Sequence, residues 1–225
     1  MERVVCLLIG FVLGHIQTAV MYCKMKGVDI RSVGSGNAGT TNTLRVMGPK
    51  AGAIVLLGDM LKCMVAIFIT YLLFGRNNPD LQILYMTYTA AGCVLGHDYP
   101  IHLHFKGGKG IACTAGYTIY LGIVFKWWFI LMGVISFFLP FNLFHIVSVC
   151  SLFYYTCLFI MVIIFGQAGG FGAIGAVLTQ GNLIEVYVIV GLLTALPYFQ
   201  HRGNIVKLIH GKERKTYIFK KNKID

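Results

Sequence analysis

The chain has 225 residues, of which 57% are hydrophobic and only 12% are charged. Soluble domains carry about 25% charged residues, so this composition excludes an ordinary soluble protein and predicts one integral membrane domain over residues 1–225. The net charge of +11 does not predict nucleic-acid binding, because the basic residues lie in short stretches between apolar runs and no nucleic-acid-reading element is present.

Apolar runs long enough to cross a bilayer recur along the chain. A transmembrane helix needs roughly 17–25 apolar residues. Four runs have this length and a fifth, shorter run holds no charge; in chain order, with the short run third, they are 4–23, 51–74, 82–96, 142–165 and 183–200. The stretch 111–139 is either one long helix or two short helices separated at Lys126. We therefore expect an all-α membrane bundle of five to seven spans.

The basic residues predict how the spans are oriented. Segments 24–50, 97–110 and 201–225 hold fifteen of the nineteen lysines and arginines, whereas the Gly-rich segment 166–181 holds none. The positive-inside rule places the three basic segments in the cytoplasm, the N-terminus outside and the C-terminus inside. Seven spans keep this alternation, so we favour seven. Lys24 and Lys26 follow the first run and no A-x-A site precedes them, so we expect this span to remain uncleaved.

The Gly-rich segment 166–181 has two interpretations. Its composition favours a flexible outer loop, and a re-entrant segment is the alternative.

The first basic segment contains the polar stretch "SVGSGNAGTTNTLR", residues 32–45. Its glycines permit left-handed backbone that lets amide N–H groups converge on an anion, and its arginine offers a planar fork for phosphate oxygens. The residues expected to bind phosphate are Gly34, Ser35, Gly36, Asn37, Asn42 and Arg45. The alternative is that a Ser or Asn of this stretch is the N-cap of a short helix that ends near Gly48-Pro49.

The second basic segment is "GHDYPIHLHFKGGKG", residues 96–110. Two ammonium groups flank two glycines just before an apolar run that should begin a helix, and a helix N-terminus adds positive potential for an anion. Phosphate is expected at Lys106, Gly107, Gly108 and Lys109. The alternative is an ordinary basic loop. Residues His97, His102 and His104 do not have zinc-site spacing, so no metal is predicted.

The third basic segment is "HRGNIVKLIHGKERK", residues 201–215. As a helix it would carry an apolar face and place His201 and Asn204 one turn apart at the membrane edge. The alternative is a basic amphipathic helix at the membrane surface with no further role.

Two charges fall inside an apolar run. Asp59 and Lys62 are three residues apart, so on a helix they can pair on one face. Each would cost about 2.5–3.5 kcal/mol near the bilayer centre, so both must face protein or water. They either support the first basic segment from below or only neutralise each other.

Together these residues resemble the bacterial acyl-phosphate-dependent glycerol-3-phosphate 1-acyltransferases, integral membrane enzymes of phospholipid synthesis. The matching positions are Ser35-Gly36-Asn37, Gly39, Thr41-Asn42, Arg45, Asp59, Lys62, Gly96-His97, Pro100, residues 105–110, His201, Asn204-Ile205, Lys207-Leu208, Gly211, Glu213 and Lys215. Where that family usually carries a GSIP-like stretch in its first span, this chain has Gly14-His15-Ile16-Gln17.

The resemblance implies seven spans in a bacterial cell membrane, with the three motifs gathered at the cytoplasmic face. It implies transfer of a fatty acyl group from acyl phosphate to the 1-hydroxyl of sn-glycerol 3-phosphate, which gives 1-acyl-glycerol 3-phosphate (lysophosphatidate) and inorganic phosphate. No cofactor and no obligatory protein partner are expected, and the partners are the two substrates and the lipid bilayer.

We hypothesise that Ser35 and Arg45 bind the phosphate of the acyl donor, and that the Lys106–Lys109 loop binds glycerol 3-phosphate. His201 and Asn204 would orient the acceptor. The proton of the attacking hydroxyl would pass to His97, to His201 or to a phosphate oxygen of a substrate. Glu213 is expected to brace the third motif through a basic neighbour. A small transporter for an anionic metabolite and a non-catalytic scaffold are the competing interpretations.

Overall fold

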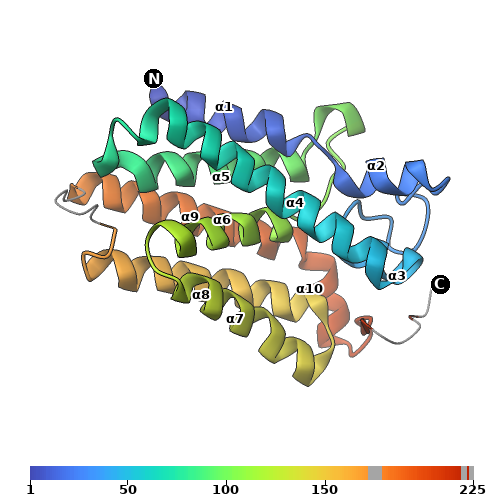
Figure 1. Ribbon diagram of the computed structural model, residues 1–225. Coiled ribbons are helices and arrows are strands. Elements are labelled where there is room, and N and C mark those ends of the chain that lie inside the picture. Colours follow the sequence, from blue (N-terminus) through green and yellow to red (C-terminus); the bar gives the residue numbers. More distant parts are fainter. Residues whose placement is uncertain (172–178, 219–221, 223–225) are drawn as a thin grey trace.

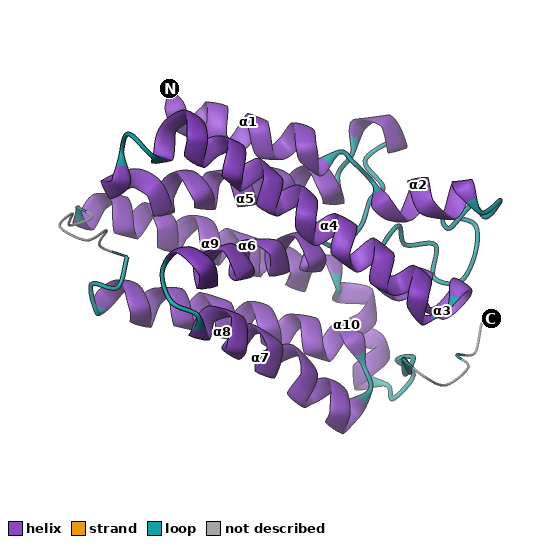
Figure 2. Cartoon of the chain, viewed as in Figure 1, coloured by secondary structure: helices purple, strands orange, loops and turns teal. Residues whose placement is uncertain are grey.

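The computed structural model describes residues 1–171, 179–218 and 222, and within them the chain is helical with no strand. Figures 1 and 2 show helices that run side by side along one direction. Their bounds are α1 Glu2–Gly14, α2 Thr18–Met25, α3 Thr40–Met47, α4 Pro49–Thr70, η1 Tyr71–Gly75, η2 Pro79–Leu81, α5 Gln82–Asp98, η3 Ile101–Leu103, α6 Ile111–Val124, α7 Trp128–Phe144, α8 Val147–Gln167, α9 Gln180–Gln200 and α10 Arg202–Ile209.

Four helical stretches among the described residues are long and apolar enough to cross a membrane: Glu2–Met25, Pro49–Gly75, Val147–Gln167 and Gln180–Gln200. Helices α5, α6 and α7 are shorter, with 17, 14 and 17 residues. The all-α prediction is therefore confirmed for the described residues. Of the Gly-rich segment 166–181, residues 172–178 lie outside the described residues.

Two predicted boundaries of the spans need correction. The first run, 4–23, is not one helix, because the chain breaks at residues 15–17 between α1 and α2. The run expected at 142–165 begins later, at Val147, because α7 continues through Pro140 to Phe144 and ends where His145 adopts a left-handed φ of 57°. The break expected at Lys126 is confirmed, since α6 ends at Val124 and α7 begins at Trp128.

Helices α1 and α5 pack at very short distance through glycines spaced four apart on each helix. A Cβ added at Gly10 would lie 1.9 Å from the Thr89 carbonyl oxygen, and one at Gly92 would lie 2.0 Å from the Leu7 carbonyl oxygen. Gly14 and Gly96 make the same kind of contact one turn further along. Small residues at this spacing let helix backbones approach closely in membranes. The contact fixes the end of α5 against the break between α1 and α2.

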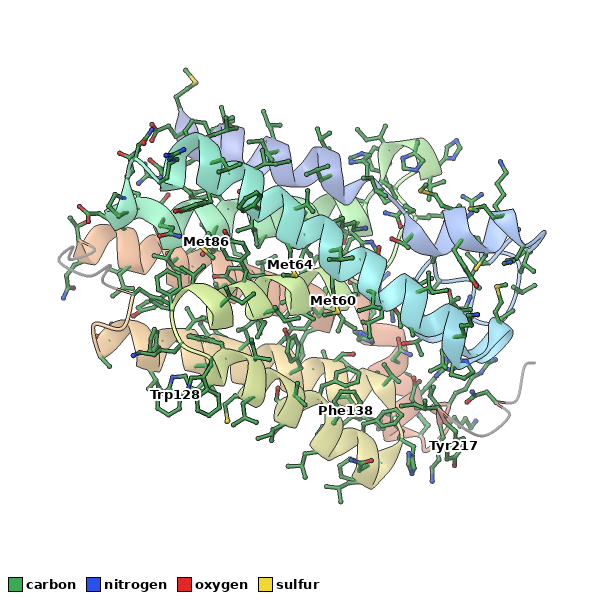
Figure 3. The ribbon with its side chains drawn as sticks, viewed as in Figure 1. Met60, Met64, Met86, Trp128, Phe138 and Tyr217 are labelled. Atoms are coloured by element: carbon green, nitrogen blue, oxygen red, sulfur yellow. The ribbon has the colours of Figure 1, made fainter. Side chains whose placement is uncertain are left out.

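Helix α6 lies between α4 and α7 (Figure 1) and packs against both. Gly116 of α6 is pressed against α4, because a Cβ there would lie 2.4 Å from the Met60 carbonyl oxygen. On the other side, a Cβ at Gly122 would lie 2.3 Å from Cγ1 of Ile130 in α7. Figure 3 labels Met60 on α4 and Phe138 on α7. The three helices thus form a trough with α6 as its floor.

At the end of the bundle that holds the N-terminus, charged residues pair across helices. Arg3 of α1 donates a 2.8 Å hydrogen bond from Nε to Glu185 of α9. Tyr88 of α5 donates to the same carboxylate. Glu185 is therefore held by an ion pair that joins the first and last long helices.

Candidate active site

All three basic segments line one cavity of about 910 Å³. The helices α3 and α10, which carry residues of the first and third segments, lie at the end of the bundle opposite the N-terminus (Figure 1). The cavity brings together side chains that are far apart in the sequence: Ser35, Arg45, Lys106, Lys109, His201 and Asn204. Their convergence was the central expectation from the sequence, and the structure agrees with it.

The first segment is shaped by a buried asparagine. Asn42 accepts a 2.8 Å hydrogen bond from the backbone N–H of Ser35, and its amide group donates to the carbonyl oxygens of Ile30 and Val33, at 3.0 Å each. Gly34, at φ +63°, lies so close that an added Cβ would be 2.3 Å from Asn42 Oδ1. The amide of Asn42 is fully occupied inside the loop, so its part in the site is to hold Ser35 at the cavity rim.

The expectation that backbone amides of this segment converge on an anion is wrong for three of them. The N–H of Ser35 goes to Asn42, that of Gly36 to the Val33 carbonyl, and that of Gly39 to the Asn37 carbonyl. The loop satisfies these three donors internally rather than directing them at a ligand. What the segment offers a phosphate is therefore side chains, chiefly Ser35, Asn37 and Arg45, all of which line the cavity.

Helix α3 positions Arg45. It is a short helix that ends just before Gly48, as the helix-capping interpretation predicted. Its N-cap is Gly39, so the expectation of a Ser or Asn there is wrong. The guanidinium of Arg45 donates to the Thr216 hydroxyl from Nε at 3.0 Å and from Nη2 at 2.6 Å. Sequence reasoning missed Thr216, because no local pattern shows a contact between residues 171 positions apart.

The two glycines of the second segment are required by packing against the end of α5. A Cβ at Gly107 would lie 2.0 Å from the His97 carbonyl oxygen, and one at Gly108 would lie 2.0 Å from His97 Nε2. The N–H groups of Gly107 and Gly108 donate to the carbonyl oxygens of Asp98 and His97. The loop therefore packs closely against the end of α5, and Lys106 is exposed at the rim of the cavity.

A chain of hydrogen bonds joins the second segment to the third. Lys109 Nζ donates to Asn204 Oδ1 at 2.7 Å and lies 3.3 Å from His201 Nδ1. Asn204 Nδ2 donates in turn to Glu213 Oε1 at 2.7 Å, which also accepts from Ser148. Glu213 does brace the third segment, although its direct partner is Asn204 rather than a basic residue. Helix α10, which carries Asn204, forms where the sequence predicted it.

Burial determines the charge states of this chain of residues. Desolvation, reinforced by the neighbouring Lys109 ammonium, lowers the pKa of His201 to about 4. Desolvation also lowers the pKa of Lys109, against the attraction of the Glu213 carboxylate. His201 is thus neutral at physiological pH, and because an ammonium can only donate, its Nδ1 accepts from Lys109 and its Nε2 carries the proton.

The predicted pair of Asp59 and Lys62 is present on α4, with Lys62 Nζ 2.9 Å from Asp59 Oδ1 and both side chains buried. Asp59 also accepts from the Thr18 hydroxyl at 2.9 Å. Lys62 donates to the carbonyl oxygens of Gly14 and Ile16. The pair therefore supports the break between α1 and α2, not the first basic segment as one of our two interpretations had it.

Two further residues beside the site were missed. Asp98, at the end of α5, accepts a 2.8 Å hydrogen bond from Gln200 Nε2, and its backbone carbonyl holds Gly107. Asp98 lies within the second segment and Gln200 directly precedes the third, but only the fold shows that the last residue of α5 meets the last residue of α9. Among the residues that the structure describes, no three His, Cys, Asp or Glu residues are grouped so as to hold a metal ion.

Away from the charged rim, the cavity extends along the trough of α4, α6 and α7. On α7 its lining recurs at helical spacing on one face: Ile130, Gly133, Val134, Phe137, Phe138 and Phe141. Val134 and Phe138 remain 50% and 44% exposed. The α7 wall of the trough is therefore apolar.

The fold and the site define an integral membrane protein in which a basic polar cavity continues into an apolar trough between helices. The chain belongs to the glycerol-3-phosphate acyltransferase family, whose sequence profile matches residues 4–211. The family resemblance seen in the sequence is thus confirmed.

Individual relatives and solved structures are consistent with this family. Glycerol-3-phosphate acyltransferase 2 of Thermotoga maritima is 36% identical over 223 residues, covering 95% of this chain and 96% of its own. Glycerol-3-phosphate acyltransferase of Clostridioides difficile is 34% identical and covers 94% of both chains. The crystal structure of PlsY, an integral membrane glycerol 3-phosphate acyltransferase, in its glycerol 3-phosphate form superposes with a TM-score of 0.76 at 28% identity over 96% of both chains. Its lysophosphatidic acid form gives a TM-score of 0.70.

Proposed function

We propose that this protein transfers a fatty acyl group from acyl phosphate to the 1-hydroxyl of sn-glycerol 3-phosphate and releases 1-acyl-glycerol 3-phosphate and inorganic phosphate. One observation carries the proposal: a single cavity has cationic side chains at one end and an apolar helical trough at the other. The cationic end suits two phosphate groups, and the trough suits an acyl chain.

In this proposal the chain crosses the membrane seven times. Helices α1 and α2 together form one crossing, and α4, α5, α6, α7, α8 and α9 form one each. The N-terminus then lies outside, and the basic segments and C-terminus lie in the cytoplasm of a bacterial cell. The cavity rim is formed by these basic segments, so both substrates would meet at the cytoplasmic face of the cell membrane.

At the rim, Ser35 and Arg45 bind the phosphate of the acyl donor, and Lys106 with Lys109 binds glycerol 3-phosphate. Charge-assisted hydrogen bonds of this kind contribute about 1.5–3 kcal/mol each. His201 and Asn204, linked through Lys109, orient the acceptor so that its 1-hydroxyl lies against the acyl carbon.

In the transfer step the 1-hydroxyl oxygen attacks the acyl carbon, the bond from that carbon to the phosphate oxygen breaks, and phosphate leaves. The proton of the hydroxyl goes to a phosphate oxygen of a substrate. Two contacts favour this acceptor over a histidine: His97 Nδ1 is 2.8 Å from Lys62 Nζ, and His201 Nδ1 is 3.3 Å from Lys109 Nζ. Because each of these histidines faces an ammonium group, neither serves as a base that would activate Ser35. A covalent intermediate on Ser35 is therefore not part of the proposal.

Purified protein in detergent should release phosphate from acyl phosphate only when glycerol 3-phosphate is present, and should form the acylated product. A transporter or a scaffold would release none. Arg45→Ala and Ser35→Ala should each lower turnover at least about tenfold, which corresponds to roughly 1.4 kcal/mol.

Lys106→Ala should mainly raise KM for glycerol 3-phosphate. Lys126→Ala is its matched control, because Lys126 is an exposed lysine outside the cavity. An effect of Lys106→Ala confined to acyl phosphate would reverse the assignment of the two phosphates.

A further inference from the structure

The segment that follows α10 lines the charged end of the cavity with Glu213 and Ile218. After Gly211, at φ +65°, residues 212–218 run without helix back toward α3 and the corner between α7 and α8. Figure 3 shows Tyr217 near the end of α7. The family profile matches residues 4–211 and so does not reach Thr216.

Thr216 is the anchor of this segment. It has 0% exposure, although Lys215 beside it is exposed. Its backbone N–H donates to the His145 carbonyl oxygen at 2.8 Å, which ties the segment to the corner between α7 and α8. Its hydroxyl oxygen accepts from both Nε and Nη2 of Arg45.

This contact fixes the plane of the Arg45 guanidinium. Arginine side chains have many rotamers, and a planar fork binds phosphate well only when it is oriented in advance. Thr216 takes the edge formed by Nε and Nη2, so the edge that includes Nη1 remains for a ligand in the cavity that Arg45 lines.

The chemistry of the anchor matters as well. A carboxylate at this place would hold the fork but would neutralise it. A neutral hydroxyl holds the guanidinium and leaves its positive charge for an anion.

We propose that Thr216 is a positioning residue for the acyl-donor phosphate: it orients Arg45, and residues 212–218 thereby form part of the substrate site. This inference rests on the proposed function, because it takes Arg45 to bind that phosphate.

The test compares Thr216→Val, which keeps the shape and removes the hydroxyl, with Thr216→Ser, which keeps the hydroxyl. Thr216→Val should raise KM for acyl phosphate about tenfold or more, while KM for glycerol 3-phosphate stays within about twofold. Thr216→Ser should keep the KM for acyl phosphate of the unmodified protein. Thr216→Asp should lower activity more than Thr216→Val does. Thr156→Val is the matched control, because this hydroxyl bonds Tyr198 at 2.8 Å between α8 and α9, away from the cavity.

Coupling to Arg45 separates positioning from general stability. In an Arg45→Lys background, which keeps the charge and loses the fork, Thr216→Val should have no further effect on KM. The proposal is overturned if Thr216→Val lowers only the thermal midpoint, if it changes both KM values equally, or if its effect adds fully to that of Arg45→Lys. If Arg45→Ala lowers phosphate release and Thr216→Val does not, this inference fails alone. If the unmodified protein releases no phosphate, the proposed function fails.

Discussion

The ammonium of Lys62 lies 2.8 Å from Nδ1 of His97, so a residue in the middle of α4 holds the last turn of α5. The same ammonium satisfies the carbonyl oxygens of Gly14 and Ile16, which the break between α1 and α2 leaves without helical partners. One cation therefore joins the first span to the second basic segment.

Lys62→Met should destabilise the protein strongly, because it leaves the Asp59 carboxylate buried and unpaired. Breaking a buried ion pair from one side costs about 3–5 kcal/mol. Thermal unfolding in detergent measures this as a lower midpoint.

The double variant Asp59→Asn with Lys62→Met should lose less than the sum of the two single losses, because it leaves no unpaired charge. Strict additivity would show that the two residues do not act as a pair.

Gly108→Ala should abolish activity and lower stability, because its Cβ would lie 2.0 Å from His97 Nε2 and His97 is held by Lys62. Gly181→Ala, near the start of α9, is the matched control, since nothing lies within 4 Å of a Cβ there. The measurements are phosphate release and the thermal midpoint of unfolding for both variants. Full activity of Gly108→Ala would mean that the close packing of this loop on α5 is dispensable.

The sequence predicted those parts of the molecule that local patterns encode. Apolar runs and the lysine at 126 located the helices, and spacing placed Asp59 and Lys62 on one face. The three polar segments could be assigned to one site because each was out of place in so apolar a chain.

The features that were missed depend on contacts between distant segments. The break at residues 15–17 is stabilised by Lys62 and by Gln17, whose side chain donates to the His97 carbonyl oxygen, and neither contact has a local signature. The direction of the loop amides was predicted wrongly for a different reason: partners within the loop itself accept these N–H groups, as Asn42, seven residues beyond Ser35, does for Ser35. Composition showed that the loop was polar, but not where its donors point.

The pH dependence of stability should reveal the neutral state of His201. Its pKa in the folded protein is about 4, against 6.5 for an ordinary histidine. Between these values the unfolded chain binds more protons than the folded one. The stability that the neutral His201 contributes is therefore complete above about pH 6.5 and is lost as the pH falls toward 4.

His201→Gln removes the titrating group. The thermal midpoint of the unmodified protein should therefore fall relative to that of His201→Gln as the pH is lowered from 7 to 5. A constant difference between the two proteins across that range would show that His201 has an ordinary pKa.

The length of the trough should limit the acyl chain that the protein accepts. Its lining on α7 runs from Phe141 near the charged rim to Ile130, eleven residues away, or about 16 Å along the helix. At that far end Ile130 packs directly on Gly122 of α6 and closes the space between the two helices.

Ile130→Ala should therefore shift the preference toward longer acyl phosphates, because it removes the side chain that closes the trough while leaving the charged rim unchanged. The measurement is kcat/KM across acyl phosphates that differ by two carbons. Leu131→Ala is the matched control: this neighbour is 43% exposed and is not part of the cavity lining, so its preference should stay that of the unmodified protein. If both variants keep the same chain-length profile, the acyl chain does not reach Ile130, and if both shift equally, the cause is a general loosening of α7 rather than the end of the trough.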